Sequence, residues 1–357
     1  MRPDPLTPGE ERADGIASRR DFLLLAAAVG LLGPAAGGCR GTVGTATADA
    51  SAAATAQQAR PPEPPALDSS YLARGLVAMS DAHQRGWVQG HLGAAVLSSC
   101  YFGREHALDE RTSRALRTNV DGFIARYASD FPPANPGPGR ADPARIVEQL
   151  GPHIGELRSG GHNTIFAALA LRALRDLPEF ATPAVVDGIC RLVEAHANTA
   201  RRIPDTRYNL EHPLPPYRGP EDVAEVTLRA TLRPWGHVRS VGASGVMHWV
   251  THAESLVTLE ELGYVDLARR GHAAHQLHIN RPVCDDGSPA PERAPNDWLG
   301  AEYWESDRPR RALGGSWLFG HSFKLPYSLF RLLRRIDDPG LRTASLARAT
   351  QLGVPFE

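Results

Sequence analysis

The sequence predicts an all-α protein: a helical bundle or an α/α toroid of quasi-repeated helical units, preceded by a signal peptide and a flexible tether. From residue 68 onward, apolar residues recur with helical spacing and almost no segment alternates strictly. Similar histidine-bearing segments recur along the chain, which indicates repeated units. Hydrophobic residues make up 42% of the 357 residues, enough to bury a core.

The N-terminal residues predict an export signal. The segment Ser18-Arg19-Arg20-Asp21-Phe22-Leu23 matches the twin-arginine translocation pattern. The apolar run 22–33 is shorter than the roughly 20 residues that a membrane-spanning helix needs. Residues 1–39 are therefore predicted to be a targeting peptide.

The sequence contains two alternative processing sites. Ala36-Gly37-Gly38-Cys39 resembles a lipoprotein box, which would place a lipid on Cys39, and Ala48-Asp49-Ala50 is a rival cleavage site. We expect a protein that is periplasmic or anchored to the membrane outside the cytoplasm, touching the bilayer only through such a lipid. The twin-arginine route carries folded proteins, often with a cofactor inserted, so export favours a bound metal or cofactor.

The remaining chain divides into a linker over residues 40–67, rich in Ala, Thr, Gly, Gln and Pro, and a single all-α domain over residues 68–357. Helical spacing predicts helices over residues 69–84, 91–104, 109–129, 142–151, 162–176, 182–200, 221–231, 245–262, 264–279, 321–336 and 338–352. Segments rich in Pro and Gly separate them at 131–142, 201–220 and 281–316.

The last of these segments is longer than an ordinary loop. Its aromatic residues favour an ordered lid over a cavity, and they are Trp298, Tyr303 and Trp304. Its carboxylates would suit a glycosidase if they converged over an α/α barrel, and they are Asp297, Glu302 and Glu305.

Four histidines each open a predicted helix at intervals of roughly 70 to 90 residues. They are His91, His162, His248 and His321. The start of a helix carries partial positive charge, which keeps an imidazole neutral and able to act as a base, hydrogen-bond partner or metal ligand. We expect the four rings to converge on one interior chamber. The alternative is that each marks only a helix boundary.

Other histidines and the single lysine add candidates. His248 and His252 lie four residues apart on one helix face, so they are candidate metal ligands if a third ligand arrives from elsewhere; the alternative is that both are satisfied interior histidines. The stripe of His272, His275 and His278 is interpreted as packing against a neighbouring helix or loop. Lys324 is the one lysine among 39 basic residues, which makes it a candidate functional residue.

Composition and missing motifs exclude several classes. Lys+Arg 39 against Asp+Glu 40 argues against a broad nucleic-acid surface. No dinucleotide-binding glycine fingerprint, Walker A loop or Gly-x-Ser-x-Gly elbow occurs in the chain. A Rossmann-type flavin or nicotinamide domain is therefore not expected.

The order of the motifs resembles the questin oxidase-like family. Met247-His248-Trp249-Val250-Thr251 resembles that family's Met-His-x-Val-Thr helix, while Gly90-His91-Leu92 and His162-Asn163-Thr164-Ile165 resemble its two earlier histidine-bearing helices. His321 with Lys324 is similar to its late His-x-x-Lys segment.

The resemblance covers residues 70–336 and implies a function. The family's named activity is NADPH-dependent oxidative ring opening of an anthraquinone, without a standard flavin fold. It implies that the four histidines line the pocket, that Lys324 lies beside them, and that Thr251 donates a hydrogen bond.

We therefore expect an exported, monooxygenase-like oxidoreductase that acts on an aromatic or polyketide-like small molecule. A metal ion is a candidate cofactor, and NADPH is implied by the resemblance alone. Two alternatives stay open: a cofactor-free lyase or cyclase that uses His321 and Lys324, and a non-catalytic lipoprotein that binds a ligand.

Overall fold

The structure is a computed structural model that describes residues 66–199, 216–236, 243–280, 287–290, 292, 296–311 and 320–352. The predicted signal peptide, Cys39 and the linker up to residue 65 lie outside these residues. Pro61–Glu357 forms one compact unit. Leu67, at the end of the predicted linker, is already buried in its core.

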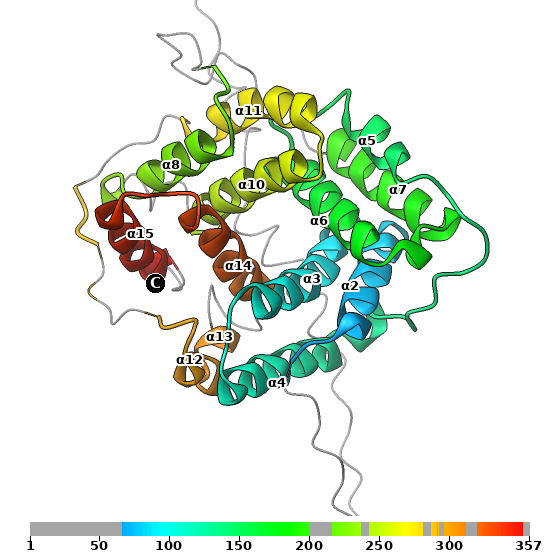
Figure 1. Cartoon of the computed structure of the whole chain (residues 1–357), viewed down its shortest axis with the longest axis horizontal. Coiled ribbons are helices and arrows are strands. Elements are labelled where there is room, and N and C mark those ends of the chain that lie inside the picture. Colours follow the sequence, from blue (N-terminus) through cyan, green and yellow to red (C-terminus); the bar gives the residue numbers. More distant parts are fainter. Residues whose placement is uncertain are drawn as a thin grey trace, which may run out of the picture. The chain divides into compact units, whose positions relative to one another are not determined.

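The described part of the chain is all-α, as the sequence predicts, and its helices form an inner ring and an outer layer (Figure 1). The inner helices are α3 (Gly90–Glu105), α6 (His162–Asp176), α10 (Ala243–Glu261) and α14 (His321–Leu333). Each contacts the next, because α3 packs on α6, α6 on α10, α10 on α14, and α14 on α3. The ring therefore closes.

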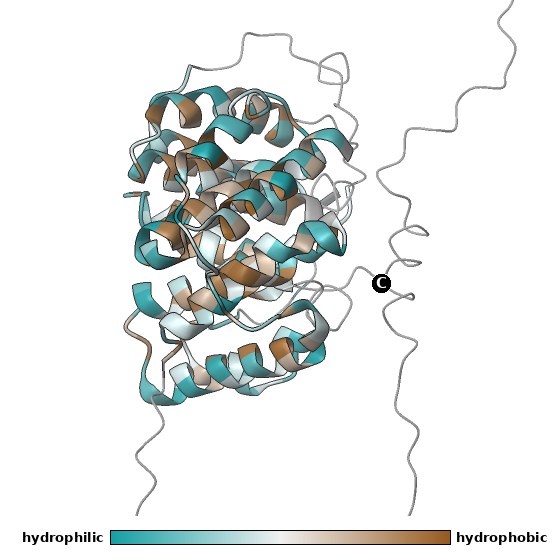
Figure 2. Ribbon diagram, turned by 90° about the vertical axis from the view of Figure 1, so that its right-hand side faces the viewer, coloured by the Kyte–Doolittle hydropathy of each residue, from teal (hydrophilic) through white to brown (hydrophobic). Residues whose placement is uncertain are grey.

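Amphipathic helices surround this ring. They are α2 (Ser69–Asp81), α4 (Glu110–Arg126), α5 (Ala144–Leu150), α7 (Pro183–Thr199), α8 (Pro220–Thr231), α11 (Val265–Ile279) and α15 (Pro339–Leu352). Figure 2 shows hydrophobic and hydrophilic residues mixed along the helices, as expected of helices with one face on a core and the other in water. None of the described helices is long and apolar enough to cross a membrane.

Short helices fill the connections. The turns of 3₁₀ helix are η1 (Ala82–Gln84), η2 (Trp87–Gln89), η3 (Ala128–Asp130), η4 (Ser159–Gly161) and η5 (Pro178–Phe180), and the short α-helices are α12 (Ala301–Glu305) and α13 (Arg308–Arg311). Both short α-helices fall in the segment predicted to be irregular. Composition hides them because each is only four or five residues long.

The aromatic residues of this segment belong to the core. Trp298, Tyr303 and Trp304 are 2%, 5% and 1% exposed. The Trp304 indole donates a hydrogen bond to the Trp298 carbonyl at 2.8 Å, and its ring stacks on Phe323 of α14 at 6.0 Å. In the described residues these aromatic side chains pack α12 against α4 and α14, and the lid over a cavity stays a prediction.

One histidine does not lie at the start of its helix as the sequence predicts. Helix α10 begins at Ala243, so His248 lies in its second turn, whereas His162 and His321 are the first residues of α6 and α14 and His91 is the second of α3. The partial charge of a helix end acts mainly in the first turn. The charge at the helix start therefore acts on three of the four histidines and not on His248.

Close helix packing at Gly320 gives a stability prediction. Gly320 caps α14 with φ of 74°, and a Cβ there would lie 2.1 Å from the Cβ of Ala95 on α3. Gly320→Ala is expected to destabilise the protein by about 1–3 kcal/mol more than Gly263→Ala, because overpacking adds to the left-handed backbone strain. Gly263 is the matched control, with φ of 90° and no atom within 4 Å of the added Cβ. Urea unfolding measures both variants, and equal losses would contradict the prediction.

Candidate metal centre

Each helix of the inner ring contributes one histidine to a single cluster. We call His91, His162, His248 and His321 the four-histidine group; one ring nitrogen of each lies within 4.8 Å of one from every other. Neighbouring ring centroids are 4.4 Å apart for His91 and His162, 4.5 Å for His162 and His248, and 5.1 Å for His248 and His321. The rings that the sequence analysis expected to converge are thus in direct contact.

Burial controls the protonation of this group. His91, His162 and His321 are 5%, 7% and 4% exposed, and His248 is half-buried. Burial lowers the pKa of His91 well below its ordinary value, and the nearby Lys324 adds to this. Burial also lowers the pKa of His162, with His248 and His196 contributing. Removal from water is therefore the first cause of the lowered pKa of both His91 and His162.

Backbone carbonyls fix the tautomer of two rings. His91 Nδ1 lies 2.8 Å from the Val88 carbonyl oxygen, and His162 Nδ1 contacts the Ser159 carbonyl oxygen. A carbonyl only accepts, so each Nδ1 carries the proton and each Nε2 holds a lone pair. The buried Nε2 of His162 has no hydrogen-bond partner in the described residues. This outer contact is the one that orients metal-ligating histidines in proteins.

The spacing of the ring nitrogens fits a metal ion. His321 Nε2 and His248 Nε2 lie 3.3 Å apart. Nitrogens bound at about 2.0–2.1 Å in a tetrahedral site lie about 3.3–3.4 Å from each other. Four neutral imidazoles are a donor set that zinc, copper, iron and nickel accept. The four-histidine group therefore fits a transition metal without rearrangement of this pair.

The two histidines proposed from spacing as a metal pair divide between two clusters. His248 belongs to the four-histidine group, whereas His252 contacts His275 and His278 of α11. The turn at η4 lies between them, since a Cβ on Gly160 would lie 3.7 Å from the His248 ring and one on Gly161 would lie 2.7 Å from the His252 ring. Both histidines thus lie in metal-compatible clusters, but in different ones.

Lys324 and Thr251 lie close to the four-histidine group in the chain. Lys324 is one turn after His321 and 3% exposed, and burial lowers its pKa well below its ordinary value. The protonated form of Lys324 would add to the lowering of the pKa of both His91 and His162. Thr251 is also buried, and its hydroxyl donates to the His248 carbonyl at 3.4 Å.

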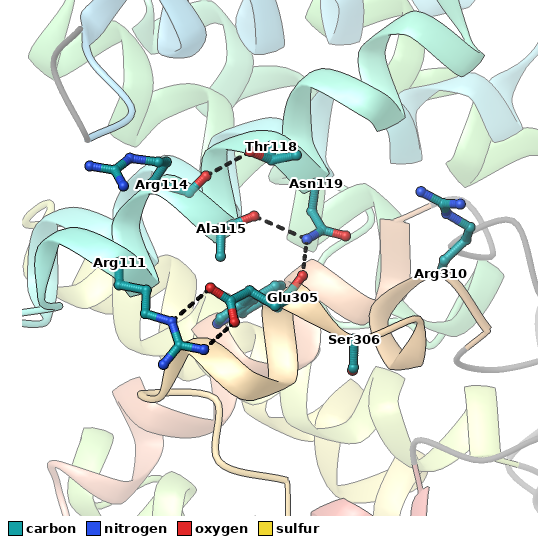
Figure 3. A pocket seen from close by; sticks show the side chains of 9 residues that line it. Arg111, Arg114, Ala115, Thr118, Asn119, Glu305, Ser306 and Arg310 are labelled. Atoms are coloured by element: carbon teal, nitrogen blue, oxygen red, sulfur yellow. Dashed lines mark hydrogen bonds and ion pairs between the residues drawn. The ribbon is translucent and has the colours of Figure 1, made fainter. Parts of the chain in front are cut away.

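The carboxylates of the long segment lie elsewhere. Glu302 and Glu305 both bind Arg111 of α4 on the outer surface. Figure 3 shows the pair of Arg111 with Glu305. Glu305 borders a surface pocket of about 340 Å³ lined by Arg111, Arg114, Asn119 and Arg310 among others. Asp297 accepts a hydrogen bond from the Leu299 amide at 3.1 Å. The structure gives these carboxylates no contact with the four-histidine group, so the glycosidase arrangement is not formed.

Two features of the centre escaped the sequence analysis. His196 of α7 stacks on His162 at 5.2 Å, and its Nδ1 lies 2.9 Å from the Ser159 hydroxyl. On the other side of α10, Glu254 pairs with Arg331 at 3.0 Å and accepts from the Tyr327 hydroxyl at 2.8 Å. The available signal for this buried pair was a charged residue within an apolar stretch of each helix.

The lowered pKa values predict how stability depends on pH. Burial lowers the pKa of His91, His162 and His275, and that of His252 to about 4. In the unfolded chain these groups titrate near 6.5. Stability of the metal-free protein should therefore be full above about pH 6.5 and fall below it, by up to about 1.4 kcal/mol per pH unit for each histidine.

Urea unfolding of chelator-treated protein between pH 7.5 and pH 5 measures this slope. The variant His252→Leu, which lacks one buried imidazole, should lose less stability over the same range. The prediction would be contradicted if the free energy of unfolding of His252→Leu depended on pH as steeply as that of the unsubstituted protein. A free energy of unfolding that rises on acidification would also contradict it.

Comparison of the chain with protein-family models, with curated proteins and with solved structures finds no match.

Proposed function

We propose that the four-histidine group binds a redox-active transition metal and that the protein is a monooxygenase-like oxidoreductase for an aromatic or polyketide-like small molecule. The observation that carries the proposal is the meeting of four imidazoles, one from each inner helix and three of them buried, with two tautomers fixed for ligation. The resemblance to the questin oxidase-like family, quoted on the same histidines, supports the aromatic substrate class.

The donor set is compatible with a redox-active metal. The group includes no carboxylate or thiolate among the described residues. Nitrogen donors suit copper and iron as well as zinc. A bound iron or copper ion would supply electron transfer between the substrate and an oxidant, which the protein side chains do not provide.

The surrounding side chains would handle protons and exclude water. Phe166 packs edge-on against His91 at 5.2 Å and also contacts His162 at 5.4 Å, so one side of the group is apolar. Burial lowers the pKa of the Lys324 amine well below its ordinary value, which favours the neutral form of the amine. A neutral amine can accept the proton of a phenolic hydroxyl, and a phenolate is more easily oxidised than a phenol.

A second candidate rests on the same lysine. A buried amine with a lowered pKa, three residues from a buried histidine, also suits a cofactor-free lyase or cyclase, in which Lys324 attacks a carbonyl, water leaves to give an imine, and His321 moves a proton. Borohydride reduction in the presence of a ketone substrate tests it. A trapped adduct that Lys324→Met abolishes would support this candidate over the oxidoreductase.

Oxygen uptake by the purified protein tests the main proposal. We expect metal-dependent consumption of oxygen with hydroxyanthraquinones and NADPH as an electron donor, and its loss after chelation. Lys324→Met should retain the metal but lose at least about tenfold in rate, since a positioned base contributes about 10²–10⁴-fold. The same variant should unfold at higher urea, because it removes a buried amine that the unfolded chain protonates. Absence of metal and of turnover with every quinone would overturn the proposal.

A further inference from the structure

A second cluster of histidines lies between α10 and α11, and the proposed function does not use it. His252, His275 and His278 are 1%, 0% and 7% exposed, and one ring nitrogen of each lies within 4.8 Å of those of the other two. The His252 ring is 5.2 Å from that of His275 and 5.8 Å from that of His278. We call these residues the three-histidine group.

A hydroxyl fixes the tautomer of His275. The Thr227 hydroxyl donates its one proton to the Val223 carbonyl at 2.6 Å. The same oxygen lies 2.8 Å from His275 Nε2 and must therefore accept from it. His275 consequently carries its proton on Nε2 and a lone pair on Nδ1, and this buried Nδ1 has no hydrogen-bond partner in the described residues.

His252 is the more unusual member. Both of its ring nitrogens are buried, and neither has a hydrogen-bond partner within the described part of the chain. A polar group removed from water without a partner is destabilising, and native proteins seldom keep one without a reason. The positive φ of Gly161 at 84° brings the backbone of the η4 turn against this ring, where a Cβ would lie 2.7 Å away. The η4 turn therefore covers the His252 ring and keeps water away from it.

We propose that the three-histidine group is a second transition-metal site, distinct from the four-histidine group. Three neutral imidazoles with an outer hydroxyl on one of them form the donor set that binds zinc or copper, with one coordination position left for a small ligand. His248 and His252 are four residues apart on α10, which corresponds to about 6 Å along the helix axis. The two sites are close enough to be neighbours and far enough apart to hold separate ions.

Metal counting on the full chain tests this inference separately from the proposed function. Protein stripped with a chelator is titrated with Zn²⁺ or Co²⁺ alone, and the bound metal is measured after dialysis. We expect two equivalents for the unsubstituted protein. His275→Gln with His278→Gln should retain one equivalent, and His91→Gln with His321→Gln should retain the other. His272→Gln is the matched control, because His272 is buried on the same helix but lies outside the group.

A more conservative substitution tests the same site without replacing any of the histidines. Thr227→Val keeps the shape of the side chain but removes the oxygen that receives the His275 proton. We expect affinity at the second site to fall about 10–100-fold while the first site is unaffected, as for loss of an outer partner in other metal sites. The Co²⁺ spectrum of the second site should change in the same variant.

The outcomes separate the two proposals. The first outcome is a single bound equivalent that is lost when His91 and His321 are replaced but kept when His275 and His278 are replaced. That result would overturn the second site and leave the proposed function standing. One equivalent with the opposite dependence would overturn the metal role of the four-histidine group and support the second site. No bound metal would overturn both, and two equivalents unaffected by Thr227→Val would overturn the role of the hydroxyl.

Discussion

Replacement of His162 by glutamine is expected to remove the metal from the four-histidine group and to abolish turnover. His162 is the first residue of α6, its Nδ1 is held by the Ser159 carbonyl, and its buried Nε2 has no other partner in the described residues. Loss of a direct ligand should cost more than the roughly 10–100-fold in affinity that loss of an outer partner costs. Metal content and quinone-dependent oxygen uptake measure the result.

His106→Gln is the matched control for this prediction. Like His91, His106 contacts through Nδ1 a carbonyl that precedes it in the chain, here that of Phe102 at 2.9 Å, but it caps the C-terminal end of α3. We expect this variant to retain the metal and the activity. Equal metal content in His162→Gln and His106→Gln would show that the four-histidine group is a packed core of neutral rings.

Arg331→Met is expected to destabilise the protein by about 3–5 kcal/mol, because breaking a buried ion pair leaves its partner charged and uncompensated. Arg331 is 8% exposed and contacts Glu254 at 3.0 Å and Glu105 at 3.2 Å. It also pairs with Glu261, so it joins α14 to both α3 and α10. Urea unfolding at pH 7 measures the loss.

The double variant Arg331→Met with Glu254→Gln identifies the cause. Glutamine keeps an oxygen for the Tyr327 hydroxyl but carries no charge. We therefore expect the double variant to be more stable than Arg331→Met alone. If the two losses simply added, the destabilisation would come from lost packing of the arginine side chain instead of an uncompensated charge.

The helices were largely predictable because periodicity and turn residues agree. Helix α6 has the predicted bounds 162–176, since an apolar segment follows Gly161 directly. Helices α12 and α13 were missed because each is shorter than two turns and lies among prolines and charges. Their packing comes from Trp298 and Trp304, whose partner Phe323 is on α14. Contacts of that kind depend on the tertiary fold and leave no local pattern.

The four-histidine group was predictable from repetition, whereas the three-histidine group was not. Each inner helix presents one histidine near its start, so closing the ring brings the four together. The spacing of His275 and His278 placed them on one face of α11, but it did not predict which helix packs against that face. Spacing also joined His252 to His248, although the η4 turn directs them into different clusters. That division is a property of one tight turn, which helical periodicity does not encode.

The most direct measurement is an anomalous diffraction map recorded at the iron or copper absorption edge on crystals of metal-replete protein. We expect a peak about 2.0–2.1 Å from one ring nitrogen of each of His91, His162, His248 and His321. Crystals whose protein carries metal in solution, but whose map is featureless between these four rings, would contradict it.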